Sequence, residues 1–214
     1  MMKWSKIQAV HNLGVNFRRR RMSKFYALMA PASDAKVLDI GGRVNTWTTE
    51  SSTSQQFPVT LINLEPAAEP EDKRFQVVEG DATALPFADR SFDIAFSNSV
   101  IEHVGGWENQ QAFAKEARSV GDKLWIQTPA RSFPVEPHLL APFIHWLPKS
   151  VQRRLVRNFT VWGWMVRPNQ EHADTFLSWI RLLTLAEFKL LFPDCRILKE
   201  RVLGMTKSYI AVRT

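Results

Sequence analysis

The sequence predicts an α/β fold built on a doubly wound, mostly parallel sheet. Four short segments are apolar throughout instead of alternating with polar residues, which is typical of parallel strands that helices cover on both faces. Three of these four segments end in a glycine turn or an acid. In open sheets of this kind ligands bind beyond the carboxyl ends of the strands, so we expect a ligand site there.

The expected elements follow one another along the chain. Strands are predicted, from apolar runs bounded by turn residues, at residues 35–40, 58–64, 75–78, 92–96 and 123–128. A polar loop with a short helix is expected over 43–56. The spacing of apolar residues predicts a helix over 107–120.

Residues 129–180 interrupt this order. Prolines punctuate an aromatic stretch that is too apolar for a linker, so we expect an insertion that folds over the sheet edge as a helical lid. After it, Thr184 is the expected N-cap of a helix over 183–192. Residues 196–203 and 208–212 are expected to form an antiparallel terminal hairpin.

Charge is distributed unevenly along the 214 residues. The net charge is +7, and the first 30 residues hold seven Lys and Arg and no acid, so the remainder is balanced. We therefore expect a basic N-terminal helical arm over 1–34 and one domain over 35–214. The single cysteine, Cys195, excludes an internal disulfide framework and a Cys-rich zinc site. The apolar stretch after Arg21 is short for a secretory signal, which favours a cytoplasmic protein.

Acidic residues and glycines lie at the ends of the predicted strands. Gly41 and Gly42 allow a ligand to approach the main chain closely. Glu65, 24 positions after Gly41, could accept hydrogen bonds from ribose hydroxyls, and Asp81 could accept one from an exocyclic amine. Asp39 could face a cationic group. Each of these residues also has a purely structural interpretation, such as Asp81 capping a helix at Thr83.

The ligand is expected to be S-adenosylmethionine rather than a dinucleotide. The Gly-x-Gly-x-x-Gly fingerprint is absent after the first strand, and an acid at Asp39 suits a pyrophosphate poorly. A zwitterionic ligand with an ammonium group and a cationic sulfur suits it better.

The same segments resemble the motifs of class I S-adenosylmethionine-dependent methyltransferases of the type 11 branch. The matching stretches are Val37–Gly42, Leu64–Pro66, Gly80–Ala82 with Leu85–Phe87, Ser91–Asp93 and Ser99–Val104. The resemblance covers about residues 35–128 and implies a Rossmann-like, seven-stranded sheet with an antiparallel last strand. The residues expected at the cofactor are Asp39, Gly41, Gly42, Arg43, Glu65, Asp81, Ala82, Ser97 and Asn98.

The glycine loop departs from the family pattern. Arg43 and Asn45 stand where the family has its later two glycines. Arg43 is expected either to pair with the carboxylate of the methionine moiety or to crowd the site, which would weaken or abolish cofactor binding.

His103 is the candidate general base, because it follows the fourth strand end beside the expected methyl donor. The competing interpretation makes it a packing or capping residue at a helix start. His138, His145 and Trp146 are expected to face the acceptor from the lid. No metal site is expected, since His138 and Glu136 supply only two ligands.

The acceptor is expected to be a small molecule or a lipid- or glycan-linked group, methylated on oxygen or nitrogen. The fourth strand ends in Ser97–Val100 and lacks the Asn/Asp-Pro-Pro-Tyr/Phe box of base N-methyltransferases. Cys195 lies too far along the chain to act as a nucleophile beside the donor.

Basic and aromatic residues suggest peripheral contact with an anionic membrane. They comprise Arg153, Arg154 and Arg157 in the lid, followed by Phe159, Trp162 and Trp164, and Trp4, Phe17, Phe25 and Tyr26 around the arm. Alternatively, the aromatic residues form the core of the lid. The runner-up function is an RNA methyltransferase that uses the basic arm, and a third possibility is a non-catalytic subunit.

Overall fold

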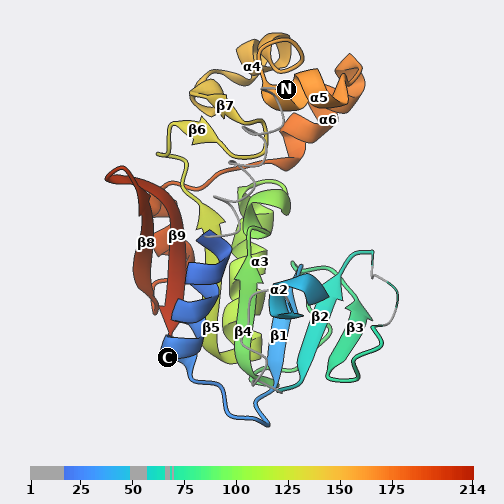
Figure 1. The fold of residues 1–214 in the computed structure, drawn as a ribbon, viewed down its shortest axis with the longest axis vertical. Coiled ribbons are helices and arrows are strands. Elements are labelled where there is room, and N and C mark those ends of the chain that lie inside the picture. Colours follow the sequence, from blue (N-terminus) through green and yellow to red (C-terminus); the bar gives the residue numbers. More distant parts are fainter. Residues whose placement is uncertain (1–16, 49–56, 66–67, 69) are drawn as a thin grey trace, which may run out of the picture.

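The computed structural model describes residues 17–48, 57–65, 68 and 70–214. Its main sheet has seven strands in the order β3-β2-β1-β4-β5-β9-β8 (Figure 1). The strands are β1 (Val37–Ile40), β2 (Val59–Asn63), β3 (Phe75–Glu79), β4 (Phe92–Asn98), β5 (Gly121–Pro129), β8 (Arg196–Val202) and β9 (Met205–Arg213).

The first five strands of this sheet are parallel, and β9 runs antiparallel to both β5 and β8. Strand β1 lies in the centre, with Asp39 opposite Leu61 of β2 and Phe96 of β4. The predicted mostly parallel sheet with a reversed last strand is therefore confirmed. All five parallel strands end at the same edge, which is where the acids were expected to meet.

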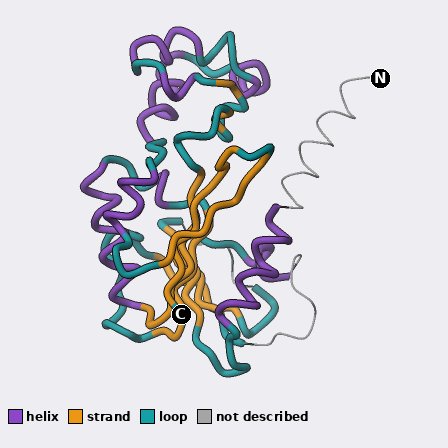
Figure 2. Tube along the Cα trace, turned by 90° about the vertical axis from the view of Figure 1, so that its left-hand side faces the viewer, coloured by secondary structure: helices purple, strands orange, loops and turns teal. Residues whose placement is uncertain are grey.

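Helices cover both faces of the sheet, which Figure 2 shows edge-on. On one face lie α3 (Trp107–Val120) and α7 (Leu185–Leu191), which bury Phe113 and Phe188. Thr184 and Glu187 form a capping box at the start of α7, which confirms the predicted N-cap. On the opposite face lie α2 (Val44–Thr48) and a helix over 17–29. Within the described part of the chain, every helix falls short of the length and hydropathy that a membrane span needs.

The helix over 17–29 is part of the domain rather than a separate arm. Met22, Phe25 and Met29 lie on one side of it and are at most 1% exposed. The ring of Phe25 packs edge-on against Phe96 at 5.1 Å and Trp125 at 5.6 Å. The predicted boundary at residue 34 is therefore wrong for this helix, and residues 1–16 lie outside the described part. Because Phe25 is buried, it also cannot contribute to a membrane or RNA surface.

A buried ion pair fixes the same helix to the far edge of the sheet. The Arg21 guanidinium donates to both carboxylate oxygens of Glu200, at 3.1 and 2.7 Å. It also donates to Gln127 Oε1 at 2.7 Å. Each side chain of the ion pair is 7% exposed. One of the basic residues assigned to the arm therefore has a structural role.

Residues 130–180 form a subdomain beyond the carboxyl edge of the sheet (Figure 1). Its elements are β6 (Val135–Glu136), β7 (Ala141–Pro142), the 3-10 helix η2 (Ile144–Trp146), α4 (Lys149–Leu155), α5 (Val161–Val166) and α6 (Gln170–Trp179). It has its own small core around Leu139, Val156 and Leu177, against which Trp162 packs while stacking on Phe176 at 4.3 Å. That this subdomain closes as a lid stays a prediction.

Candidate functional site

A pocket of about 590 Å³ lies at the carboxyl edge of the parallel strands. Glu65 after β2 and Asp81 after β3 both line it, together with the glycine turn after β1. The full lining comprises Gly41, Arg43, Ile62, Asn63, Leu64, Glu65, Gly80, Asp81, Ala82, Thr83, Ser99, Val100, His103, Val104 and Asn109. The structure thus brings the two predicted acids into one hollow.

The turn after β1 requires glycine at its first position. Gly41 has φ +73°, and a Cβ atom there would lie 2.6 Å from the side chain of Val100. At Gly42 a Cβ atom would lie 1.8 Å from the Asp39 carboxylate. Arg43 and Asn45 have ordinary negative φ values, so their side chains do not strain the loop. Arg43 lines the pocket, as expected.

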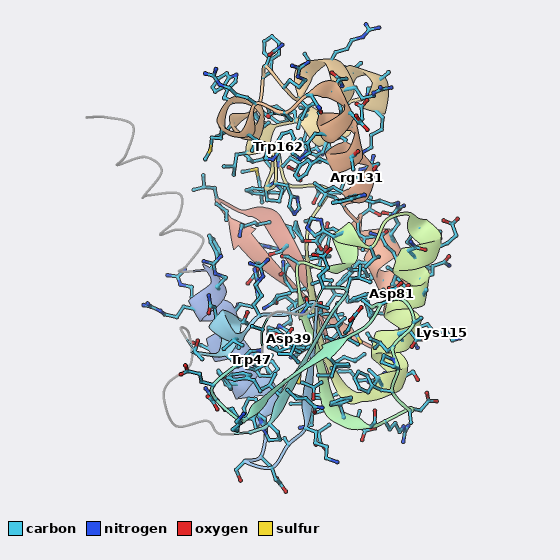
Figure 3. All side chains as sticks on the ribbon, turned by 90° about the vertical axis from the view of Figure 1, so that its right-hand side faces the viewer. Asp39, Trp47, Asp81, Lys115, Arg131 and Trp162 are labelled. Atoms are coloured by element: carbon cyan, nitrogen blue, oxygen red, sulfur yellow. The ribbon has the colours of Figure 1, made fainter. Side chains whose placement is uncertain are left out.

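Asp39 does not line the pocket, which corrects its expected direct contact with the ligand. It is 1% exposed behind Gly42, and its Oδ2 accepts a hydrogen bond from Trp47 Nε1 at 2.8 Å (Figure 3). The other oxygen, Oδ1, is buried and has no partner among the described residues. Burial raises the pKa of Asp39 to about 7, against the opposing effect of the Trp47 hydrogen bond.

Asp81 lines the pocket, and it also stabilises the chain at Thr83, which forms a turn and does not begin a helix. Its Oδ1 accepts hydrogen bonds from the backbone N–H and the hydroxyl of Thr83, each at 2.8 Å. The carboxylate still lies in the pocket wall beside Ala82. Asn63, which the sequence analysis missed, ties two strand ends together, because its Nδ2 donates to Gly42 O at 3.0 Å. A polar residue at the end of an apolar strand was the available signal.

Ser97 and Asn98 do not reach the pocket, contrary to expectation. Strand β4 continues through Asn98, and the Ser97 hydroxyl is buried and donates to Ile40 O at 2.9 Å. The chain turns at Ser99, which has φ +57°, so Ser99 and Val100 line the pocket instead. The apolar pattern underestimated the length of β4, and that length decides which of these polar residues lines the pocket.

His103 lies in the pocket wall, where the sequence placed the candidate base. It ends the 3-10 helix η1 (Ile101–His103). Partial burial and the neighbouring His138 lower the pKa of its imidazole to about 4, so the ring is neutral at pH 7. Next to it, Glu102 is completely buried, and its Oε2 accepts a hydrogen bond from Thr128 Oγ1 at 2.9 Å. Burial raises the pKa of Glu102 to about 7.

Of the three predicted acceptor-facing residues, only His138 lies beside His103, although it does not line the pocket itself. The His138 ring packs edge-on against His103 at 4.6 Å. Its Nδ1 is hydrogen-bonded to Glu136 Oε1 at 2.7 Å. Burial disfavours the charged ring, but the hydrogen bond and charge of Glu136 outweigh this effect and raise the pKa of His138.

His145 and Trp146 lie elsewhere. Their ring nitrogens approach the carbonyl oxygen of Arg131 at 3.0 and 2.7 Å, and both side chains line other hollows. They anchor η2 to the chain that leaves β5, a contact that proline and aromatic spacing could not predict.

Residues 39–123 match the family model of a methyltransferase domain of type 11. A search of curated proteins finds no match. Among solved structures, a SAM-dependent methyltransferase from Methanosarcina mazei is 17% identical, with 85% of this chain and 92% of that chain covered and a TM-score of 0.50. A SAM-dependent methyltransferase from Aquifex aeolicus is 12% identical, with 91% and 88% covered and a TM-score of 0.50.

A third similar structure was solved with ligands. The 1,6-didemethyltoxoflavin-N1-methyltransferase of Burkholderia thailandensis, with bound 1,6-didemethyltoxoflavin and S-adenosylhomocysteine, is 18% identical. The alignment covers 97% of this chain and 84% of that chain, with a TM-score of 0.53. At such identities the likeness concerns the fold. The match over residues 39–123 confirms the resemblance to type 11 methyltransferases seen in the sequence, and the sheet has the same fold as the similar SAM-dependent methyltransferase structures.

Proposed function

We propose that the protein transfers a methyl group from S-adenosylmethionine to a small-molecule or lipid-linked acceptor. One observation carries the proposal: Gly41, Glu65 and Asp81 line a single pocket at the strand ends. Its volume of about 590 Å³ lies in the range of small-molecule sites. The bound S-adenosylhomocysteine of the Burkholderia structure supports the same ligand class.

The residues of the pocket suit this cofactor. The exposed Glu65 carboxylate could accept hydrogen bonds from both ribose hydroxyls. Asp81 keeps Oδ2 for the exocyclic amine, since Oδ1 is occupied by Thr83. Arg43 could pair with the carboxylate of the methionine moiety. When bound, the cofactor supplies a methyl group on a cationic sulfur, which is already activated for displacement.

The chain then has to position the acceptor. A lone pair of the acceptor oxygen or nitrogen forms the bond to the methyl carbon while the electrons of the sulfur–carbon bond return to sulfur. Holding the two reactants in line supplies much of the acceleration. We propose His103 as the catalytic residue, because it lines the pocket and an imidazole there can accept the acceptor's proton.

Calorimetric titration with S-adenosylhomocysteine tests the cofactor site. Glu65→Gln should weaken binding about 10- to 100-fold, because it removes charge-assisted hydrogen bonds. Glu79→Gln is the matched control, since Glu79 is an exposed acid at the end of β3 that lies outside the pocket lining. Absence of binding to the wild-type chain would instead favour the non-catalytic subunit.

A membrane-borne acceptor is favoured by an exposed surface of the subdomain, here called the α5 patch. It consists of Phe159, Trp164 and Met165, which are 68%, 64% and 69% exposed, with Arg157 and Arg167. Trp164 and both arginines line one shallow hollow. Aromatic side chains interleaved with cations are the pattern of an interfacial surface that contacts anionic lipid.

Co-sedimentation with vesicles tests the α5 patch. The wild-type chain should bind vesicles that contain phosphatidylserine and leave pure phosphatidylcholine vesicles unbound. Replacing Phe159, Trp164 and Met165 by serine should abolish binding, whereas Leu190→Ser with Leu203→Ser, on exposed leucines outside the subdomain, should not. Equal binding by both variants, or a salt-sensitive RNA shift without lipid binding, would contradict this acceptor class.

A further inference from the structure

Three potential metal ligands meet where the pocket touches the subdomain. Glu102, His103 and His138 each offer one ligand atom, and these atoms all lie within 4.8 Å of one another. Glu102 and His103 belong to η1 after β4, whereas His138 belongs to the subdomain. The cluster is therefore created by the fold rather than by a local motif.

The burial and hydrogen bonding of Glu102 provide an independent observation that points to a ligand at this cluster. Its side chain is 0% exposed, and Thr128 occupies Oε2. The other oxygen, Oε1, is buried without a hydrogen-bond partner in the part of the chain that the structure describes. A buried carboxylate oxygen without a partner is costly, and buried charges are normally paired or bound to a metal.

The surroundings orient the ligands as outer partners do in metal proteins. Glu136, 2% exposed, hydrogen-bonds Nδ1 of His138 at 2.7 Å, which leaves Nε2 as the nitrogen for a cation. A carboxylate behind a histidine in this way fixes its tautomer and ring orientation. Thr128 orients the Glu102 carboxylate by donating a hydrogen bond to its Oε2. The nearby Arg21 cation is compensated by its own pair with Glu200.

We propose that Glu102, His103 and His138 bind a divalent transition-metal ion of the Zn²⁺ class. Two imidazole nitrogens and one carboxylate oxygen form a donor set of catalytic zinc sites, which leave a coordination position open. Magnesium and calcium prefer ligand sets made of oxygen alone. The ligand atoms, which are at most 4.8 Å apart, need separations of roughly 3.5 Å to surround one ion at bonds of about 2.1 Å, a change that side-chain rotation can supply.

The open position would face the acceptor, since His103 lines the pocket. This consequence rests on the proposed methyl transfer, whereas metal binding does not. A cation there lowers the pKa of a hydroxyl that binds it and so releases the proton to solvent at neutral pH. Metal ligation and proton acceptance use the same lone pair of His103, so the loaded enzyme would activate its acceptor through the cation.

Titration of the chelator-treated, full-length chain with ZnCl₂ tests the site by calorimetry. The wild type should bind one equivalent. His138→Gln and His103→Gln should each lower the affinity by more than the about 10- to 100-fold expected for Glu136→Gln, which alters only an outer partner. His145→Gln is the matched control from the same subdomain and should bind like the wild type, and MgCl₂ should not compete.

Absorption of Co²⁺ in place of Zn²⁺ gives a readout that a general loss of stability does not imitate. A tetrahedral spectrum in the wild type that His138→Gln abolishes would support the ligand set. Equal Zn²⁺ affinity of the wild type, His103→Gln and His138→Gln, or no binding at all, would overturn it. Titration of the same samples with S-adenosylhomocysteine separates this outcome from failure of the proposed methyl transfer.

Discussion

The sheet domain and the subdomain over 130–180 differ in how far their aromatic side chains are exposed. In the sheet domain Phe25, Trp47 and Trp125 are at most 2% exposed and pack edge to face. In the subdomain Phe159 and Trp164 are more than 60% exposed. Burial on both sides of a central sheet gives the first region stability and a fixed pocket. The second region has a small core and leaves apolar side chains exposed on its surface.

The largest contrast is expected between one buried ion pair of the sheet domain and one exposed ion pair of the subdomain, measured by their contribution to stability. Arg21→Ala leaves the Glu200 carboxylate buried without its cation, so it should lower the free energy of unfolding by about 3–5 kcal/mol. Arg153→Ala breaks the ion pair with Asp174, in which the Arg153 side chain is 57% and the Asp174 side chain 28% exposed, and should leave the free energy of unfolding almost unchanged because solvent screens the pair. Urea unfolding followed by tryptophan fluorescence measures both, and similar losses would contradict the contrast.

Truncation of one buried and one exposed aromatic side chain compares how much packing stabilises each region. Phe25→Ala removes a fully buried ring from contacts with Phe96 and Trp125 and should cost about 3–5 kcal/mol. Phe159→Ala removes an exposed ring and should change stability by less than about 0.5 kcal/mol. Thermal unfolding of the two variants gives the result. A large loss with Phe159→Ala would mean that the α5 patch is structural.

Buried acids should make the sheet domain sensitive to pH. The pKa of Asp39 is about 7 in the folded chain against an ordinary value of 3.8, so the folded state binds more protons between these values. Its contribution to stability is greatest at low pH and declines as the pH rises to about 7. Relative to the wild type, Asp39→Asn should therefore gain roughly 2–4 kcal/mol between about pH 5 and about pH 8. If the free energy of unfolding of the two chains varied with pH in the same way, the raised pKa of Asp39 would be refuted.

Helix caps should show the smallest difference between the regions, because they act locally. Thr184 caps α7 in the sheet domain, and the Asn169 side chain accepts from the His172 N–H at 2.8 Å to cap α6 in the subdomain. Alanine at either position should cost about 1 kcal/mol. If only Thr184→Ala shifts the main urea transition, the subdomain unfolds separately.

Local patterns in the sequence were enough to predict the sheet and the pocket at its strand ends. Apolar runs, the Gly41 turn and the acids Glu65 and Asp81 are short-range signals, because parallel strands must all deliver their carboxyl ends to one edge. The cap at Thr184 was equally readable, since its partner Glu187 lies three residues away.

The residues behind and beside that pocket follow from long-range packing and could not be predicted from local patterns. Asp39 turned away to Trp47, and Ser99 replaced Ser97 in the wall, because burial and the end of β4 depend on neighbouring strands. Arg21 forms an ion pair with Glu200, and His138 lies beside Glu102 and His103, although these residues are far apart in the sequence. No periodicity within a segment encodes which distant side chains share a desolvated space, since that follows from how the segments pack.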